Sequence, residues 1–163
     1  MTKPTASEVL AALRERGLSL ATAESCTGGL VGGALTAVPG SSDTYRGGII
    51  SYTNEVKNRL LGVPEELLSQ YGAVSAQVAE AMALGAASAL GADVAVSTTG
   101  LAGPGGDEFG NPVGTVYLAC ALRGAVRSVS CRFSGDREQV RRAAVETALA
   151  LLLRTVTGEG KEP

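Results

Sequence analysis

Two adjacent nucleophilic side chains, the Ser25 hydroxyl and the Cys26 thiol, follow a short apolar run near the N-terminus. They lie in the motif Ala23-Glu24-Ser25-Cys26-Thr27-Gly28-Gly29, which precedes a segment with helical patterning. A strand, a sharp turn and a helix beginning at Gly28-Gly29 would expose Ser25 beside a helix N-terminus, where backbone N–H groups stabilise a developing oxyanion. Ser and Thr before a helix are also common N-caps, so the motif alone leaves a nucleophile and a cap both open.

The sequence contains no histidine. This excludes Ser-His-Asp and Cys-His nucleophile pairs, and it excludes every metal site that depends on imidazole. Proton transfer in this chain would therefore depend on Lys, Tyr, Asp, Glu or backbone groups.

Lysine is scarce: Lys3 and Lys161 lie in the terminal tails, and Lys57 is the remaining lysine. Arg keeps its proton at neutral pH, whereas the pKa of a partly buried Lys can fall into the working range. Neutral Lys57 could accept the proton of Ser25, as in Ser-Lys nucleophile pairs, or it could be a solvated lysine at a helix start. Tyr52 ends a predicted strand, where it could donate or relay a proton or be a half-buried aromatic.

Cys26 competes with Ser25, because a thiolate is intrinsically the better nucleophile and a helix N-terminus lowers a thiol pKa. Adjacent residues at a turn usually point in opposite directions, and no histidine is present to pair with the thiol. We therefore interpret Cys26 as a packing residue. The sequence assigns no role to Glu24.

A second glycine-rich segment runs from Thr98 to Gly106. No lysine follows it, and it lacks the glycine spacing of a dinucleotide-binding turn. Its amides and hydroxyls could cradle a planar ring or a phosphate, or the segment could be a plain mobile loop. Arg137 opens the last predicted helix, where it could pair with phosphate or serve only solubility.

Length and composition indicate one domain, spanning residues 1–163 with a core of about 5–157 and a tail at 158–163. The chain is 45% hydrophobic but only 4% aromatic, and its 22 glycines suit close packing of small residues in an α/β sandwich. The net charge of −2 favours neither nucleic acid nor an anionic membrane as a partner. Three cysteines without a C-x-x-C pair, and no signal-peptide pattern, predict a cytoplasmic location.

Hydrophobic periodicity and turn residues predict alternating helices and strands. The predicted helices span residues 5–16, 27–38, 53–62, 64–71, 75–91 and 136–157. The predicted strands span residues 18–24, 47–52, 93–98, 114–122 and 126–133. This order predicts a three-layer α/β/α sandwich with a mixed, mostly parallel sheet of about five strands. The loops at 24–29, 51–57 and 98–106 follow strands, so we expect them to meet at one edge of the sheet.

Seven blocks occur in an order that resembles the CinA C-terminal domain family over roughly residues 5–155. The blocks are Ala23–Gly29, Pro39–Ser42, Ser51–Lys57, Gly72–Ser75, Thr99–Gly106, Pro112–Val116 and Phe133–Arg137. The resemblance implies hydrolysis of the carboxamide of nicotinamide mononucleotide to nicotinate mononucleotide and ammonia, within pyridine nucleotide recycling. It implies no metal or cofactor, and a homodimer or larger homo-oligomer. Longer CinA proteins carry an N-terminal nucleotide-processing domain, whose activity we do not expect here.

By the same resemblance Ser25 is the nucleophile, Lys57 is its base, and Tyr52 lies close by. The residues that would bind the nucleotide are Thr27, Gly28, Gly29, Gly40, Ser41, Ser42, Asn54, Thr99, Gly100, Ala102, Gly103 and Arg137.

Two other functions stay open. The domain could be a non-catalytic nucleotide-binding module linked to competence or the DNA-damage response. It could also be an amidase for another small carboxamide.

Overall fold

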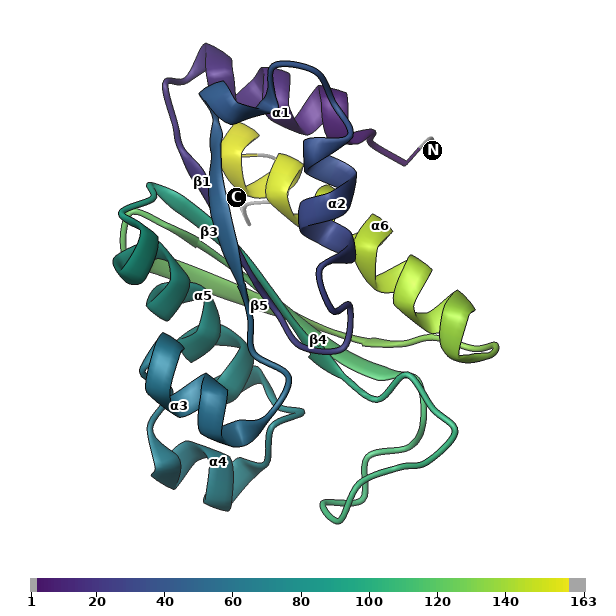
Figure 1. Ribbon diagram of the computed structural model, residues 1–163. Coiled ribbons are helices and arrows are strands. Elements are labelled where there is room, and N and C mark those ends of the chain that lie inside the picture. Colours follow the sequence, from purple (N-terminus) through teal and green to yellow (C-terminus); the bar gives the residue numbers. More distant parts are fainter. Residues whose placement is uncertain (1–2, 159–163) are drawn as a thin grey trace.

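Residues 3–158, which the computed structural model describes, form a five-stranded sheet with helices on both faces (Figure 1). The strands are β1 (Leu20–Glu24), β2 (Tyr45–Ile50), β3 (Val94–Gly100), β4 (Thr115–Leu122) and β5 (Ala125–Arg132). They lie in the order β2-β1-β3-β4-β5; β1 pairs parallel with both neighbours, and β3, β4 and β5 pair antiparallel. The predicted three-layer fold with a mixed sheet is confirmed. The end of the predicted tail, residues 159–163, lies outside the described residues.

The helices are divided between the two faces of the sheet (Figure 1). They are α1 (Ala6–Glu15), α2 (Leu30–Thr36), α3 (Asn54–Leu61), α4 (Glu65–Tyr71), α5 (Ala76–Leu90) and α6 (Arg137–Thr157). One face carries α1, α2 and α6, and the other carries α3, α4 and α5.

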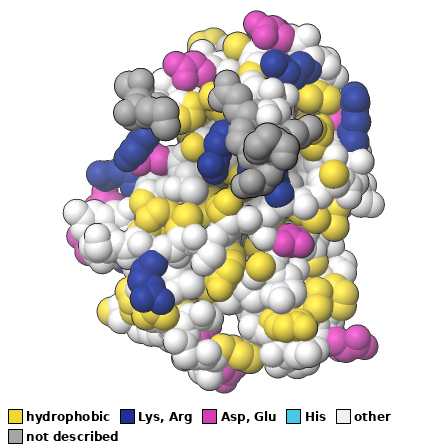
Figure 2. Space-filling view, turned by 180° about the vertical axis from the view of Figure 1, so that it is seen from behind, with side chains coloured by type: hydrophobic (Ala, Val, Ile, Leu, Met, Phe, Trp, Pro, Cys, Tyr) yellow, Lys and Arg dark blue, Asp and Glu magenta, His cyan; other side chains and the backbone are white. Residues whose placement is uncertain are grey.

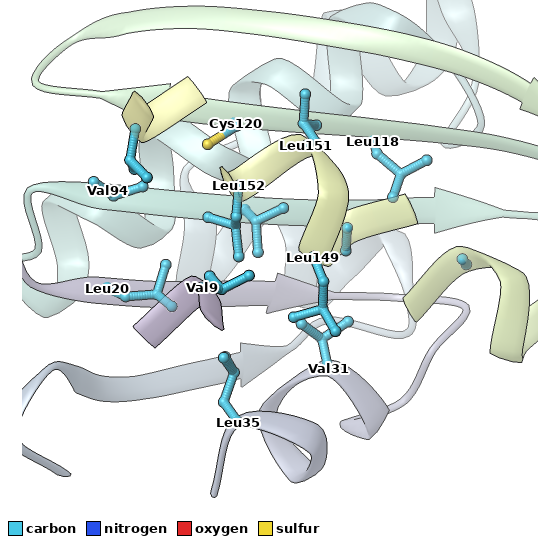
Figure 3. Close-up of a cluster of buried hydrophobic side chains, with 14 of the residues drawn as sticks. Val9, Leu20, Val31, Leu35, Val94, Leu118, Cys120, Leu149, Leu151 and Leu152 are labelled. Carbon is cyan, nitrogen blue, oxygen red and sulfur yellow. The ribbon is translucent and has the colours of Figure 1, made fainter. Parts of the chain in front are cut away.

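Side-chain size alternates along the central strands and differs between the faces. Large residues such as Leu20, Val94 and Leu118 point toward α1, α2 and α6, where they form the cluster in Figure 3. Alanines such as Ala21 and Ala95 point toward α5, so that this helix packs close to the sheet. This alternation with a period of two residues is what a strand covered on both faces requires.

The helix caps follow local sequence. Asp136 and Gln139 form the predicted capping box at the start of α6, and Ser75 caps α5 as predicted. Thr53 caps α3 by accepting a hydrogen bond from the Val56 amide at 3.3 Å. This cap fixes the start of the helix that carries Lys57.

Several element boundaries differ from the predictions by two or more residues, among them the starts of α2 and β2. Helix α2 begins at Leu30 instead of residue 27, because Gly28 and Gly29 have φ of 56° and 106° and form a turn. Strand β2 begins at Tyr45, two residues before the predicted start, and its Gly47 and Gly48 pair with β1.

Within residues 3–158, no helix combines the length and apolar character that crossing a bilayer would need.

Candidate functional site

The carboxyl ends of β1, β2 and β3 meet at one edge of the sheet, and the loops that follow them surround a cavity of about 390 Å³. This volume is in the range of small-molecule sites, roughly 300–1,000 Å³. The predicted site residues that line it are Ser25, Tyr52, Asn54, Lys57, Thr99, Gly100, Ala102, Gly103 and Arg137. The structure thus brings together three loops that are far apart in the sequence.

Lys57 and Ser25 are joined by a hydrogen bond at the base of this cavity. The Lys57 Nζ donates to Ser25 Oγ at 3.0 Å and to the Ser51 carbonyl at 2.9 Å. Lys57 is only 1% exposed and Ser25 only 7% exposed, so the pair is shielded from bulk water. The backbone of Ser25 is held against β3, because its amide donates to the Thr98 carbonyl at 3.0 Å.

Burial lowers the pKa of Lys57 from its ordinary value of 10.5 to about 8. The cause is desolvation, which disfavours the charged ammonium. None of the ion pairs formed within residues 3–158 involves Lys57, so no carboxylate restores its charge. About a tenth of Lys57 is therefore neutral at pH 7, and the neutral form is the one that can act as a general base for a hydroxyl.

The Cys26 thiol has the opposite character. Burial raises its pKa to about 11, so the thiol keeps its proton at neutral pH and is a poor nucleophile. The geometry and the protonation state both favour Ser25 over Cys26.

Tyr52 and Arg137 form one rim of the cavity. The Arg137 guanidinium donates to the Tyr52 hydroxyl at 3.1 Å and to the Gly103 carbonyl at 2.8 Å. Tyr52 is 59% exposed, so its hydroxyl faces the cavity mouth and is not buried in the core. Arg137 thereby ties the start of α6 to the glycine-rich loop.

The wall formed by the glycine-rich loop depends on close backbone contacts. The Thr99 hydroxyl donates to the Ala73 carbonyl at 2.8 Å, which joins the end of β3 to the segment before α5. A side chain at Gly100 would place its Cβ 2.8 Å from the Thr115 carbonyl oxygen, so only glycine fits there.

Thr27, Gly28 and Gly29 do not line the cavity, contrary to our expectation. Thr27 is fully buried, and the Gly28 amide donates to the Ser25 carbonyl at 3.1 Å. The start of α2, which we expected to present free amides beside an exposed Ser25, is occupied by the Glu24 carboxylate.

Gly40, Ser41 and Ser42 also lie away from the cavity. Ser41–Asp43 forms a single turn of 3₁₀ helix just before β2, at the amino end of that strand. Because β2 is parallel to β1, this turn lies at the opposite edge of the sheet from Ser25. The structure therefore does not bring these residues to the site.

Several residues at the site were not predicted, and Phe109 is the largest of them. It lines the cavity and lies against Gly72, where an added Cβ would come within 2.6 Å of the ring. Asp107 shapes this loop by accepting from the amides of Phe109 and Asn111 at 3.0 and 2.9 Å. The sequence held one signal for this turn: Asp107 directly follows the Thr98–Gly106 segment and precedes Phe109 by two residues, a spacing typical of an aspartate that accepts from the backbone of a turn.

Comparison with known proteins identifies similar sequences. The model of the CinA C-terminal domain family matches residues 2–156 of this chain. The CinA-like protein of Geobacter sulfurreducens is 52% identical over 141 residues, which cover 86% of this chain and 34% of that protein. The CinA-like protein of Gemmatimonas aurantiaca is 49% identical over 144 residues, covering 88% of this chain and 34% of the relative. The chain thus spans about a third of the length of these curated relatives.

Solved structures show the same fold over nearly the whole chain. A competence-damaged protein (CinA) superfamily protein of Klebsiella pneumoniae is similar with a TM-score of 0.92 and 38% identity, covering 94% of this chain and 96% of that chain. The competence/damage inducible protein CihA of Agrobacterium tumefaciens is similar with a TM-score of 0.88 and 44% identity, covering 93% of each chain.

Proposed function

The chain belongs to the CinA C-terminal domain family, and on that basis we propose that it hydrolyses the carboxamide of nicotinamide mononucleotide, releasing nicotinate mononucleotide and ammonia. The observation that carries the proposal is the buried hydrogen bond of 3.0 Å between Lys57 Nζ and Ser25 Oγ. A lysine that is 1% exposed, has a lowered pKa and touches a serine hydroxyl is the arrangement that a Ser-Lys nucleophile pair requires.

The first half of the reaction forms an ester on the enzyme. Neutral Lys57 accepts the Ser25 proton while Ser25 Oγ attacks the carboxamide carbon and the carbonyl oxygen becomes an oxyanion. The Cys26 amide is the natural donor to this oxyanion, because it follows the nucleophile directly and makes no hydrogen bond to a backbone carbonyl within residues 3–158. Protonated Lys57 then gives its proton to the departing nitrogen, and the C–N bond breaks to release ammonia.

The second half restores the enzyme. Neutral Lys57 accepts a proton from water, and the resulting hydroxide attacks the ester carbon. The C–O bond to Ser25 breaks, the hydroxyl regains its proton from Lys57, and the carboxylic acid product leaves.

The walls of the cavity suit a nucleotide that carries an aromatic ring. Tyr52 and Phe109 offer aromatic surface near Ser25, and the Arg137 guanidinium offers positive charge at the rim. We propose that Arg137 binds the phosphate, while Asn54, Thr99 and the glycine-rich loop hold the remainder of the nucleotide.

The test measures ammonia and nicotinate mononucleotide released by the purified protein. We expect Ser25→Ala and Lys57→Ala to abolish release, while both variants still bind the nucleotide in a thermal-shift assay. If both variants keep rates near wild type, the assignment is wrong.

The same experiment separates the alternatives. A non-catalytic nucleotide-binding module would gain thermal stability from nicotinamide mononucleotide without consuming it. An amidase for another small carboxamide would leave this nucleotide intact and release ammonia from another member of a carboxamide panel.

A further inference from the structure

We propose that Glu24 and Arg141 are positioning residues that hold the nucleophile turn, Ser25–Gly28, from its two sides. The inference rests on the proposed function, because it concerns the geometry of Ser25 during attack. Neither residue lines the cavity, so neither would touch the substrate.

The Glu24 carboxylate accepts hydrogen bonds from donor groups of the turn and of the start of α2. This carboxylate is 2% exposed and accepts from the Thr27 hydroxyl at 2.6 Å and from the amides of Gly29, Val31 and Gly32 at 3.2, 2.9 and 3.0 Å. No ion pair within residues 3–158 includes Glu24, so these hydrogen bonds are the polar contacts of its carboxylate.

A buried carboxylate is more than the short helix α2 needs. A Ser, Thr or Asn side chain commonly satisfies the first amides of a helix without burying a charge. Glu24 instead reaches from the end of β1, next to Ser25, and binds the Thr27 hydroxyl of the turn as well as amides at the start of α2. The Thr27 hydroxyl continues the network to Thr98 on β3 at 2.8 Å.

The Arg141 guanidinium donates hydrogen bonds to two carbonyl oxygens of the same turn. It lies one helical turn after Arg137 on α6, and it donates from Nε to the Cys26 carbonyl at 3.1 Å and from Nη2 to the Thr27 carbonyl at 3.3 Å. A planar guanidinium that binds two successive carbonyls fixes the Cys26–Thr27 and Thr27–Gly28 peptide planes, which begin one residue after Ser25. No carboxylate within residues 3–158 forms an ion pair with Arg141, so these carbonyls are its polar partners.

These contacts leave the turn with little freedom. The carbonyls of Cys26 and Thr27 are held on the α6 side, and the amides at the start of α2 are held by Glu24. The Cys26 amide, next to the nucleophile, donates to no backbone carbonyl within residues 3–158. Glu24 and Arg141 would thus keep Ser25 Oγ facing Lys57 and the Cys26 N–H available for the oxyanion.

The test compares Glu24→Gln, Arg141→Lys and Arg141→Met with matched controls on the exposed side of α6. The controls are Glu138→Gln and Arg142→Met. These two side chains lie one turn apart on α6 and form an exposed ion pair, with 2.8 Å between Arg142 Nη2 and Glu138 Oε1. Each protein is assayed for kcat, KM, melting temperature and the rate at which a fluorophosphonate labels Ser25. In that labelling the serine oxygen bonds to phosphorus, fluoride leaves, and the proton goes to Lys57.

We expect Glu24→Gln and Arg141→Met to lower kcat and the labelling rate by roughly 10- to 100-fold with KM little changed. Arg141→Lys should restore part of both, because an ammonium can still reach one carbonyl. The controls should match wild type, and combining Glu24→Gln with Arg141→Met should cost less than the product of the single effects, since both act on one turn.

Wild-type kcat and labelling in the folded variants would overturn the inference, as would a change confined to KM or to the melting temperature. Arg141 is partly exposed, so its variants decide the matter even where Glu24→Gln fails to fold. Fluorophosphonate labelling needs no nucleotide. A wild type that is labelled at Ser25 but leaves nicotinamide mononucleotide intact therefore overturns only the proposed substrate, whereas a wild type that is neither labelled nor active overturns both proposals.

Discussion

Lys57 is the largest side chain that the fold buries completely, and its burial is unfavourable for stability. An ammonium without a carboxylate partner loses its hydration and gains only hydrogen bonds to the Ser25 hydroxyl and the backbone carbonyls of Ser51 and Tyr52. Structural lysines are normally solvated or paired, so this arrangement supports the chemical role proposed for Lys57.

The lowered pKa of Lys57 predicts how activity depends on pH. Because the base must be neutral to accept the Ser25 proton, kcat/KM for ammonia release should rise with pH and level off above about 8. Below that value the rate should fall by about tenfold per pH unit, as the neutral fraction falls. The measurement is the initial rate of ammonia release across this range.

If kcat/KM for ammonia release does not change between about pH 6.5 and about pH 8.5, the assignment of Lys57 as the base is contradicted. Lys57→Arg serves as the companion variant, since a guanidinium cannot lose its proton at these pH values. It should be inactive at every pH and show no rising limb.

The position of Lys57 depends on how α3 packs against α5. Gly85 of α5 faces the backbone of Leu61, one turn beyond Lys57 on α3, and an added Cβ would overlap the Leu61 carbonyl oxygen. The contact is with backbone, so no side-chain rotation can relieve it.

Gly85→Ala should therefore push α3 away from α5, lowering stability by about 1–3 kcal/mol and reducing activity through displacement of Lys57. The matched control is Gly33→Ala on α2, where an added Cβ meets nothing within 4 Å and the residue is exposed. This control should be neutral or stabilising by up to about 1 kcal/mol, because Ala favours helix over Gly. Denaturant unfolding and ammonia release measure both effects; equal stability of the two variants would contradict this account of the packing.

The elements of the fold could be predicted because their signals are local. The capping box at Asp136 and Gln139, the strand–turn–strand pattern around Arg123-Gly124 and the apolar periodicity of α5 all lie within short windows. The shifted start of α2 could not be predicted in this way. It depends on the Glu24 carboxylate reaching forward to the amides of Val31 and Gly32, and on the left-handed conformation of two glycines.

The candidate site divides in the same manner. Ser25, Lys57 and the glycine-rich loop follow strand ends, so topology alone predicts that they meet. Arg141 could not be predicted, because its contact with Cys26 and Thr27 joins segments more than a hundred residues apart. Gly40, Ser41 and Ser42 are the converse case: they form a recognisable block that the parallel pairing of β1 and β2 places at the other edge of the sheet from Ser25.

The molecule as a whole has one chemically distinct edge. On the face shown in Figure 2, Lys and Arg side chains are interspersed with Asp and Glu, and no single basic patch covers it. The groups with a chemical role under the proposed function gather where the central strands end, between the two helical layers. One layer supplies Lys57 and the other supplies Arg137 and Arg141, so the sheet edge works only when both layers pack against it.

The buried lysine links this edge to the stability of the whole fold. The pKa of Lys57 is about 8 in the folded protein and 10.5 ordinarily, so the unfolded chain holds a proton that the folded protein has released between these values. Stability therefore rises with pH across this window, and the penalty of burying the charged amine is fully present below about 8. That penalty is about 3 kcal/mol, at about 1.4 kcal/mol per pH unit.

Lys57→Met removes the titrating group, so its stability relative to wild type should be most favourable below pH 8 and should decline as the pH approaches 10.5. Burial also raises the pKa of Cys26 and Cys120 to about 11, which lowers stability above their ordinary value of 9.0. Cys120 cancels in the difference, but the Lys57 charge lowers the pKa of Cys26, so the two proteins are compared below pH 9.0, where both thiols keep their protons. Loss of the hydrogen bonds to Ser25 and Ser51 opposes the gain by about 1 kcal/mol each, equally at every pH. The free energy of unfolding in urea, measured for both proteins at a series of pH values, tests this; a difference that does not change with pH would show that Lys57 is charged in the folded protein throughout, and would remove the physical basis for its role as a base.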